Sequence, residues 1–114
     1  KALRDKAQTI RDLEAEAKRR LERDQDRQAY NDLLRQKART IHSLLYDLQD
    51  ELEGLPEEER DQLEEALESM GGRASQALEV DSPFFMSMLL YPQDYQEGEG
   101  NELEELISRY FGRV

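Results

Sequence analysis

Hydrophobic residues recur every three or four positions through the first half of the chain. The first stripe comprises Leu3, Ala7, Ile10, Leu13, Ala17 and Leu21, and the second comprises Leu34, Ala38, Ile41, Leu45, Leu48, Leu52 and Leu55. This spacing puts the residues on one face of an α-helix that packs against other helices. Because no Gly or Pro interrupts residues 1–53 and good helix formers dominate them, the pattern predicts helix throughout.

The sequence leaves two arrangements open for this helical stretch. Residues 22–28 contain no apolar side chain, and Asp24 or Asp26 could cap a second helix to give a hairpin. However, the Gly, Asn and Pro residues typical of tight connections are absent, and the heptad phase continues across the gap. One helix about 80 Å long is therefore favoured over the hairpin. Residues 1–27 would then project as an arm from a bundle formed by residues 28–114.

The rest of the chain predicts three or four shorter helices. Pro56 and the acids after it are typical of a helix start, and the Gly71-Gly72 pair in that helix indicates a stop, a kink or a close approach of another helix. Asn101 and Glu104 form a capping box before a last amphipathic helix. Val, Ile and Thr total only seven, which excludes sheet-based folds. The predicted fold class is all-α, a single domain of 114 residues built as an acidic helical bundle.

Charge is distributed unevenly along the chain, whose formal net charge is −11. Residues 1–39 carry a net charge of +4, whereas residues 40–114 carry −15. This asymmetry argues against a nucleic-acid partner, because most of the surface would repel phosphate. We expect the basic groups near the middle of the first stretch to lie against acidic surface of another subunit or a partner; they include Lys18, Arg19, Arg20 and Arg23.

The segment from Phe84 to Tyr91 is apolar on every side. The favoured interpretation is a buried central helix, because this segment has the densest apolar content in a chain with a thin core. The alternative is an exposed docking segment, in which Met side chains give adaptable contacts. Under that alternative, the candidate partner-binding residues are Phe84, Phe85 and Met88.

The sequence offers little for chemistry. His42 is the only histidine and there is no cysteine, so a zinc or di-iron site lacks an adequate ligand set. The loop read from Gln93 resembles a calcium-binding loop only in the positions of Gly98 and Glu104, and the acidic ligands at its start are missing. The carboxylates of residues 57–68 indicate a solvated face or a dock for a basic partner. We therefore predict no catalytic, cofactor-binding or metal-binding residues.

These observations predict a non-catalytic protein-protein interaction or assembly module, self-associating through its helices as a homo-oligomer. An acidic inhibitor or nucleic-acid mimic that occupies a basic site on a partner is the first alternative. A metal-dependent or enzymatic helical protein is the second. The sequence has no run of apolar residues long enough to span a membrane, and the absence of cysteine is compatible with a reducing compartment, so we expect a cytoplasmic protein without a membrane partner.

Overall fold

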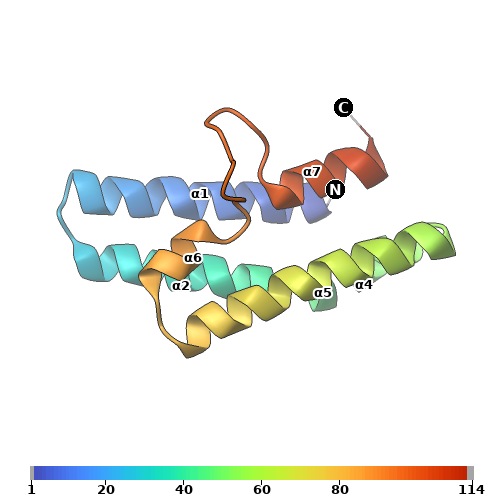
Figure 1. The fold of residues 1–114 in the computed structure, drawn as a ribbon, viewed down its shortest axis with the longest axis horizontal. Helices are drawn as coiled ribbons and strands as arrows, with labels where there is room; N and C mark the ends of the chain where they lie inside the picture. Colours follow the sequence, from blue (N-terminus) through green and yellow to red (C-terminus); the bar gives the residue numbers. More distant parts are fainter. Residues whose placement is uncertain (1, 113–114) are drawn as a thin grey trace.

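The computed structural model describes residues 2–112, which form seven helices and no strand, so the predicted all-α class is confirmed (Figure 1). The helices are α1 (Ala2–Glu22), α2 (Arg27–His42), α3 (Leu44–Asp47), α4 (Gln49–Glu53), α5 (Glu57–Glu79), α6 (Pro83–Met88) and α7 (Glu102–Phe111). Their buried apolar side chains join in one core.

The first two helices form a hairpin, so the favoured prediction of one continuous helix is wrong. Helices α1 and α2 lie side by side (Figure 1), and the longest dimension of the molecule is 47 Å, too short for a helix of about 80 Å. The stripe of α1 is used inside the chain, because Leu3, Ile10 and Ala17 are almost fully buried. Helix α1 is therefore part of the bundle and does not project from it as an arm.

The turn between α1 and α2 is built without Gly, Asn or Pro. Gln25 takes the left-handed backbone conformation, with φ of 51°, and the amide of Asp26 donates to the carbonyl of Arg20 at 2.9 Å. The Asp26 carboxylate then accepts from the amide of Ala29 at 3.0 Å and caps α2. A non-glycine residue in this conformation costs about 1–2 kcal/mol, an amount that packing of the two helices offsets. The missing glycine was therefore weak evidence against a hairpin.

Helix α5 runs unbroken through Gly71 and Gly72, which mark a close approach. A Cβ atom at Gly71 would lie 3.3 Å from the carbonyl oxygen of His42, at the end of α2. Gly71 is buried, whereas a Cβ at Gly72 would meet nothing within 4 Å. Of the three interpretations of the glycine pair, close approach of another helix is confirmed.

Helix α6 is short and follows a tight end of α5. Asp81 is left-handed, with φ of 52°, and the amide of Ser82 donates to the carbonyl of Ala77 at 3.2 Å, as in a Schellman motif. Ser82 caps α6 by accepting from the amide of Phe85. After α6 the chain makes a loop over residues 92–100, and the predicted capping box of Asn101 and Glu104 then starts α7.

The prediction of a buried central helix from Phe84 to Tyr91 is wrong. Met86, Leu89 and Leu90 are buried, but Phe84 and Phe85 are exposed. Helix α6 has only six residues and lies on the bundle surface, so only one of its sides can face the core (Figure 1). The apolar content of this segment exceeds what that one side can bury.

Candidate functional site

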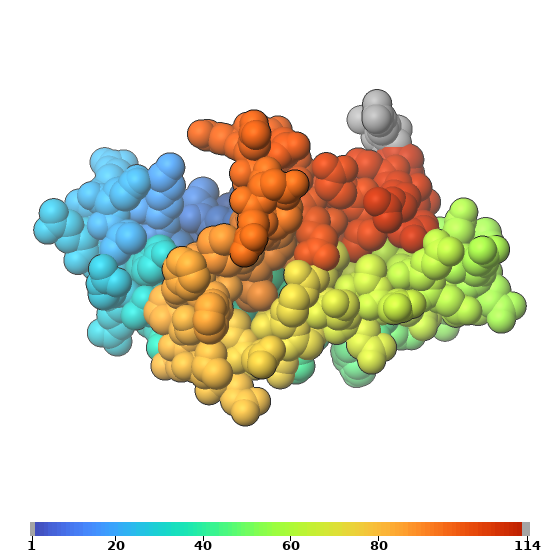
Figure 2. Space-filling view, viewed as in Figure 1, coloured from blue at the N-terminus to red at the C-terminus, as the bar shows by residue number. Residues whose placement is uncertain are grey.

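An exposed apolar surface surrounds a groove between α5 and α6. The exposed fractions are 67% for Phe84, 55% for Phe85, 41% for Met88 and 56% for Val80. The groove, called here the α5–α6 groove, has a volume of about 420 Å³ and is lined by Arg73, Gln76, Ala77, Val80, Phe85, Met88 and Leu89. Figure 2 shows this side of the molecule, with α6 beside the second half of α5. Large exposed apolar side chains gathered beside a hollow are typical of an interaction site.

Phe84, Phe85 and Met88 were predicted as partner-binding candidates, and the structure brings all three to this surface. The rings of Phe84 and Phe85 lie against each other with centroids 5.8 Å apart. Phe85 and Met88 line the groove itself. Val80 was not predicted as a candidate. It directly follows α5 as the residue that caps its C-terminal end.

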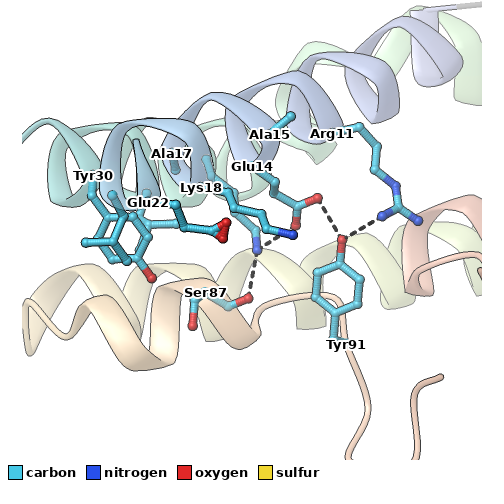
Figure 3. Close-up of a pocket in the computed structure, with 12 residues that line it drawn as sticks. Arg11, Glu14, Ala15, Ala17, Lys18, Glu22, Tyr30, Ser87 and Tyr91 are labelled. Carbon is cyan, nitrogen blue, oxygen red and sulfur yellow. Dashed lines mark hydrogen bonds and ion pairs between the residues drawn. The ribbon is translucent and has the colours of Figure 1, made fainter. Parts of the chain in front are cut away.

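A buried ion pair fastens α6 to the helical hairpin (Figure 3). The side chain of Lys37 is only 1% exposed, and its Nζ lies 2.8 Å from Oε2 of Glu14, which is 17% exposed. The same ammonium donates to the carbonyl oxygen of Ser87 at 3.1 Å and lies 5.1 Å from the ring centroid of Tyr91. One lysine of α2 thus contacts α1, α6 and the residue that leads into the loop.

Tyr91 extends this cluster toward α7. Its hydroxyl donates to Oε1 of Glu14 at 2.7 Å and accepts from Nη1 of Arg11 at 3.1 Å. Arg11 also donates two hydrogen bonds to the Glu104 carboxylate, at 2.7 and 3.0 Å. Because Glu104 belongs to the capping box of α7, a chain of charged contacts links α2, α1 and the start of α7.

Burial and hydrogen bonds shift the pKa values of these groups. Burial lowers the pKa of the Lys37 ammonium, and the nearby Glu14 carboxylate only partly opposes this. Burial and the hydrogen bond to Glu14 raise the pKa of the Tyr91 hydroxyl. The hydrogen bonds from Arg11 lower the pKa of Glu104. Side chains with shifted pKa values beside a hollow, here of about 530 Å³, are a reason to consider a catalytic site. However, the Lys37 ammonium is surrounded by the Glu14 carboxylate, the Ser87 carbonyl and the Tyr91 ring, as is typical of a cation with a structural role.

The sequence did contain a signal for this ion pair. Lys37 stands between Leu34 and Ile41, so it falls on the buried stripe of α2. Glu14 stands in the same way between Ile10 and Ala17 on α1. Opposite charges on two facing apolar stripes indicate a buried pair once the two stripes are known to face each other.

The predicted basic candidates lie at the turn end of α1. Arg19 and Arg20 form ion pairs with Glu16 on the same helix, at 2.6 and 2.9 Å. Lys18 and Arg23 are exposed, and Lys18 lines the hollow between α1 and α2. The contact of these groups with another subunit or a partner stays a prediction.

The remaining candidates lie apart from one another. His42 is exposed at the end of α2. Within residues 2–112 there is no group of three or more His, Cys, Asp or Glu side chains placed to hold a metal ion. None of the helices in the described part of the chain has the length and apolar character needed to cross a bilayer.

Comparison with known proteins adds no relative: no family model, curated protein or solved structure matches the chain.

Proposed function

We propose that this protein is a non-catalytic protein-protein interaction module whose docking surface is the α5–α6 groove with the exposed side chains of Val80 and Phe84. The observation that carries the proposal is the exposure of Val80, Phe85 and Met88 along one hollow, with the exposed ring of Phe84 against that of Phe85. Apolar residues are scarce in this chain, and full burial of one such side chain stabilises by about 1.5–3 kcal/mol. Leaving four of them together in water forgoes stability that binding of a partner would recover.

The geometry of the groove fits a protein ligand. Its α5 wall presents Arg73, Gln76, Ala77 and Val80, which share one helix face, and α6 supplies the opposite wall. Grooves between two helices commonly receive the apolar face of a third helix. The ion pair of Lys37 and Glu14 supports this role, because it holds α6 in place before a partner arrives.

The sequence predicted self-association through one long N-terminal helix, and the hairpin of α1 and α2 removes the basis for that prediction. The stripes of α1 and α2 pack inside one chain and leave no continuous apolar seam for a second copy. The oligomeric state itself stays a prediction. A second copy is therefore one of the possible occupants that an experiment on the groove must distinguish.

Site-specific photocrosslinking tests the proposal. The photoreactive amino acid p-benzoylphenylalanine replaces Phe85 in the protein in its natural host, and in a matched variant it replaces Tyr46, an aromatic residue that is 84% exposed outside the groove. We expect a discrete crosslinked protein from position 85 that is absent from position 46 and disappears when Met88→Asp is added. Equal crosslinking at both positions, or none at position 85, would contradict the proposal. A thermal melt of the Met88→Asp variant checks that its fold is kept.

A further inference from the structure

The α5–α6 groove continues along α5 into a second hollow of different character. This second hollow has a volume of about 580 Å³ and is lined by Ala66, Arg73, Tyr91, Pro92, Tyr95, Glu99, Gly100, Glu102, Glu105, Leu106 and Arg109. Arg73 borders both hollows, and its Nη2 lies 2.9 Å from both carboxylate oxygens of Glu102. One ion pair thus separates an apolar half from an acidic half.

Helix α5 forms a continuous floor beneath both halves. Ala66, Arg73 and Val80 are spaced by seven residues, two helical turns, and so lie on one face. From residue 66 to residue 80 this floor is about 21 Å long at 1.5 Å per residue. A helical ligand that spans both hollows would therefore need about 14 residues.

Charge identifies the kind of helix that fits. Residues 92–105 contain six acids and no base, and three of these acids, Glu99, Glu102 and Glu105, line the second hollow. Two bases line it as well: Arg73 is paired with Glu102, and Arg109 is exposed. Glu99, which accepts a hydrogen bond from the amide of Gln96, and Glu105 are exposed, so the hollow and the adjoining loop together keep a negative charge. A ligand with cationic side chains in this half and apolar side chains in the other would match both halves.

A second copy of this chain does not match both halves. Its net charge of −11 opposes self-association. The basic stretch 33–42 has its apolar side chains Leu34, Ala38 and Ile41 buried in the core. Residues 18–27, which hold five bases and three acids, contain Leu21 as their single apolar residue. That segment could satisfy the carboxylates but has nothing to place against Phe85 and Met88.

We infer that the partner is a basic amphipathic helix of another protein, with its apolar side chains between α5 and α6 and its Lys or Arg side chains against Glu99 and Glu105. This inference rests on the proposed function of the α5–α6 groove and names the chemistry of its partner. It requires that affinity fall with salt, because exposed charges contribute through a field that is screened over about 8–10 Å at physiological ionic strength.

Four synthetic helical peptides of 16 residues test the inference against the full chain by fluorescence anisotropy. Each peptide has Leu at positions i, i+3, i+4 and i+7 in one half. In two of the peptides the other half carries Lys, placed after the Leu half in one and before it in the other. The remaining two peptides carry Glu in the same two arrangements. We expect one Lys peptide to bind at least about 10-fold more tightly than its Glu counterpart at 50 mM salt, with most of that difference lost at 500 mM. The Phe85→Asp variant should lose binding of every peptide.

A matched pair of variants separates a specific acidic half from general attraction to an acidic protein. Glu99→Gln with Glu105→Gln should weaken the Lys peptide several-fold, whereas Asp61→Asn with Glu68→Gln, on another face of α5, should leave it unchanged. Equal weakening by both pairs, or no binding of any peptide, overturns the inference. If Lys and Glu peptides bind equally and Phe85→Asp abolishes both, the inference fails while the proposed function of the groove stands. Absence of a discrete crosslink from position 85 in the otherwise unchanged protein would count against the proposed function itself.

Discussion

Replacement of Lys37 by Met measures how strongly the buried ion pair holds the bundle together. The substitution keeps an apolar side chain of similar length on the α2 stripe and removes only the ammonium. Glu14 then loses a cation at 2.8 Å, and the carbonyl of Ser87 loses a donor at 3.1 Å. Breaking a buried pair by removing one partner costs about 3–5 kcal/mol. Because Glu14 keeps the hydrogen bond from Tyr91, we expect the lower end, about 3 kcal/mol.

A double-mutant cycle in urea provides the assay. Glu14→Gln keeps an acceptor for Tyr91 and removes the charge, and the double variant should recover part of the loss, with a coupling free energy of about 1–3 kcal/mol. Arg35→Met is the matched control. Its ion pair with Asp81 lies at the surface, where such pairs contribute about 0–1 kcal/mol.

If Lys37→Met leaves the unfolding free energy within about 0.5 kcal/mol of the wild type, or if the two single changes are simply additive, the pair does not stabilise the fold. A variant more stable than the wild type would show that the cost of burying Lys37 exceeds what its contacts return. In that case Lys37 would have a role other than stabilising the fold.

Three further predictions concern the backbone and the acid response. Gln25→Gly should raise the unfolding free energy by about 0.5–1 kcal/mol in urea melts, because glycine adopts the positive φ of the turn without strain, and Gln25→Val should lower it. Gly71→Leu should destabilise by about 1–3 kcal/mol against the carbonyl of His42, whereas Gly72→Leu, which points into open space, should not. Arg11 lowers the pKa of Glu104, so this carboxylate stabilises the fold above its unfolded pKa of about 4.5 and loses that effect as the pH falls through its lowered folded pKa; Glu104→Gln should therefore be less stable than the wild type at pH 7, by a difference that is smaller at pH 3. Equal differences at both pH values would contradict the last expectation.

Periodicity predicted which stretches of this chain are helical, because a 3.6-residue repeat shows which face is buried. It did not predict the breaks at Ser43 and Leu48, which divide residues 27–53 into α2, α3 and α4. The capping box of Asn101 and Glu104 was predicted from an equally local motif. The Gly71-Gly72 pair left a stop, a kink and a close approach open, because the contact with His42 is tertiary. The hairpin was the less favoured of two arrangements because the heptad phase is the same on both sides of the turn. Phase alone cannot distinguish a straight helix from one folded back on itself, and the cost of placing Gln25 in the left-handed region is small beside the packing of α1 on α2.

The site was harder to predict, because it depends on which segments remain uncovered. Composition favoured burial of Phe84 and Phe85, and that expectation assumed a helix surrounded by others. A helix of six residues has only one side to bury, and Met86 occupies that side, while Leu89 and Leu90 are buried just after the helix ends. The buried ion pair depends in the same way on a tertiary fact, because Lys37 and Glu14 meet only after the hairpin closes.

The two features of the site are physically connected. A helix as short as α6 has no stability of its own in water, since nucleation of so few residues is unfavourable. Its position depends on the core contacts of Met86 and Leu89 and on the hydrogen bond from Lys37 to Ser87. The proposed groove therefore has a rigid α5 wall and an α6 wall whose order depends on a buried charge. Lys37→Met should accordingly weaken binding of the Lys peptide even under conditions where the bundle remains fully folded, because part of the binding free energy would then be used to order α6.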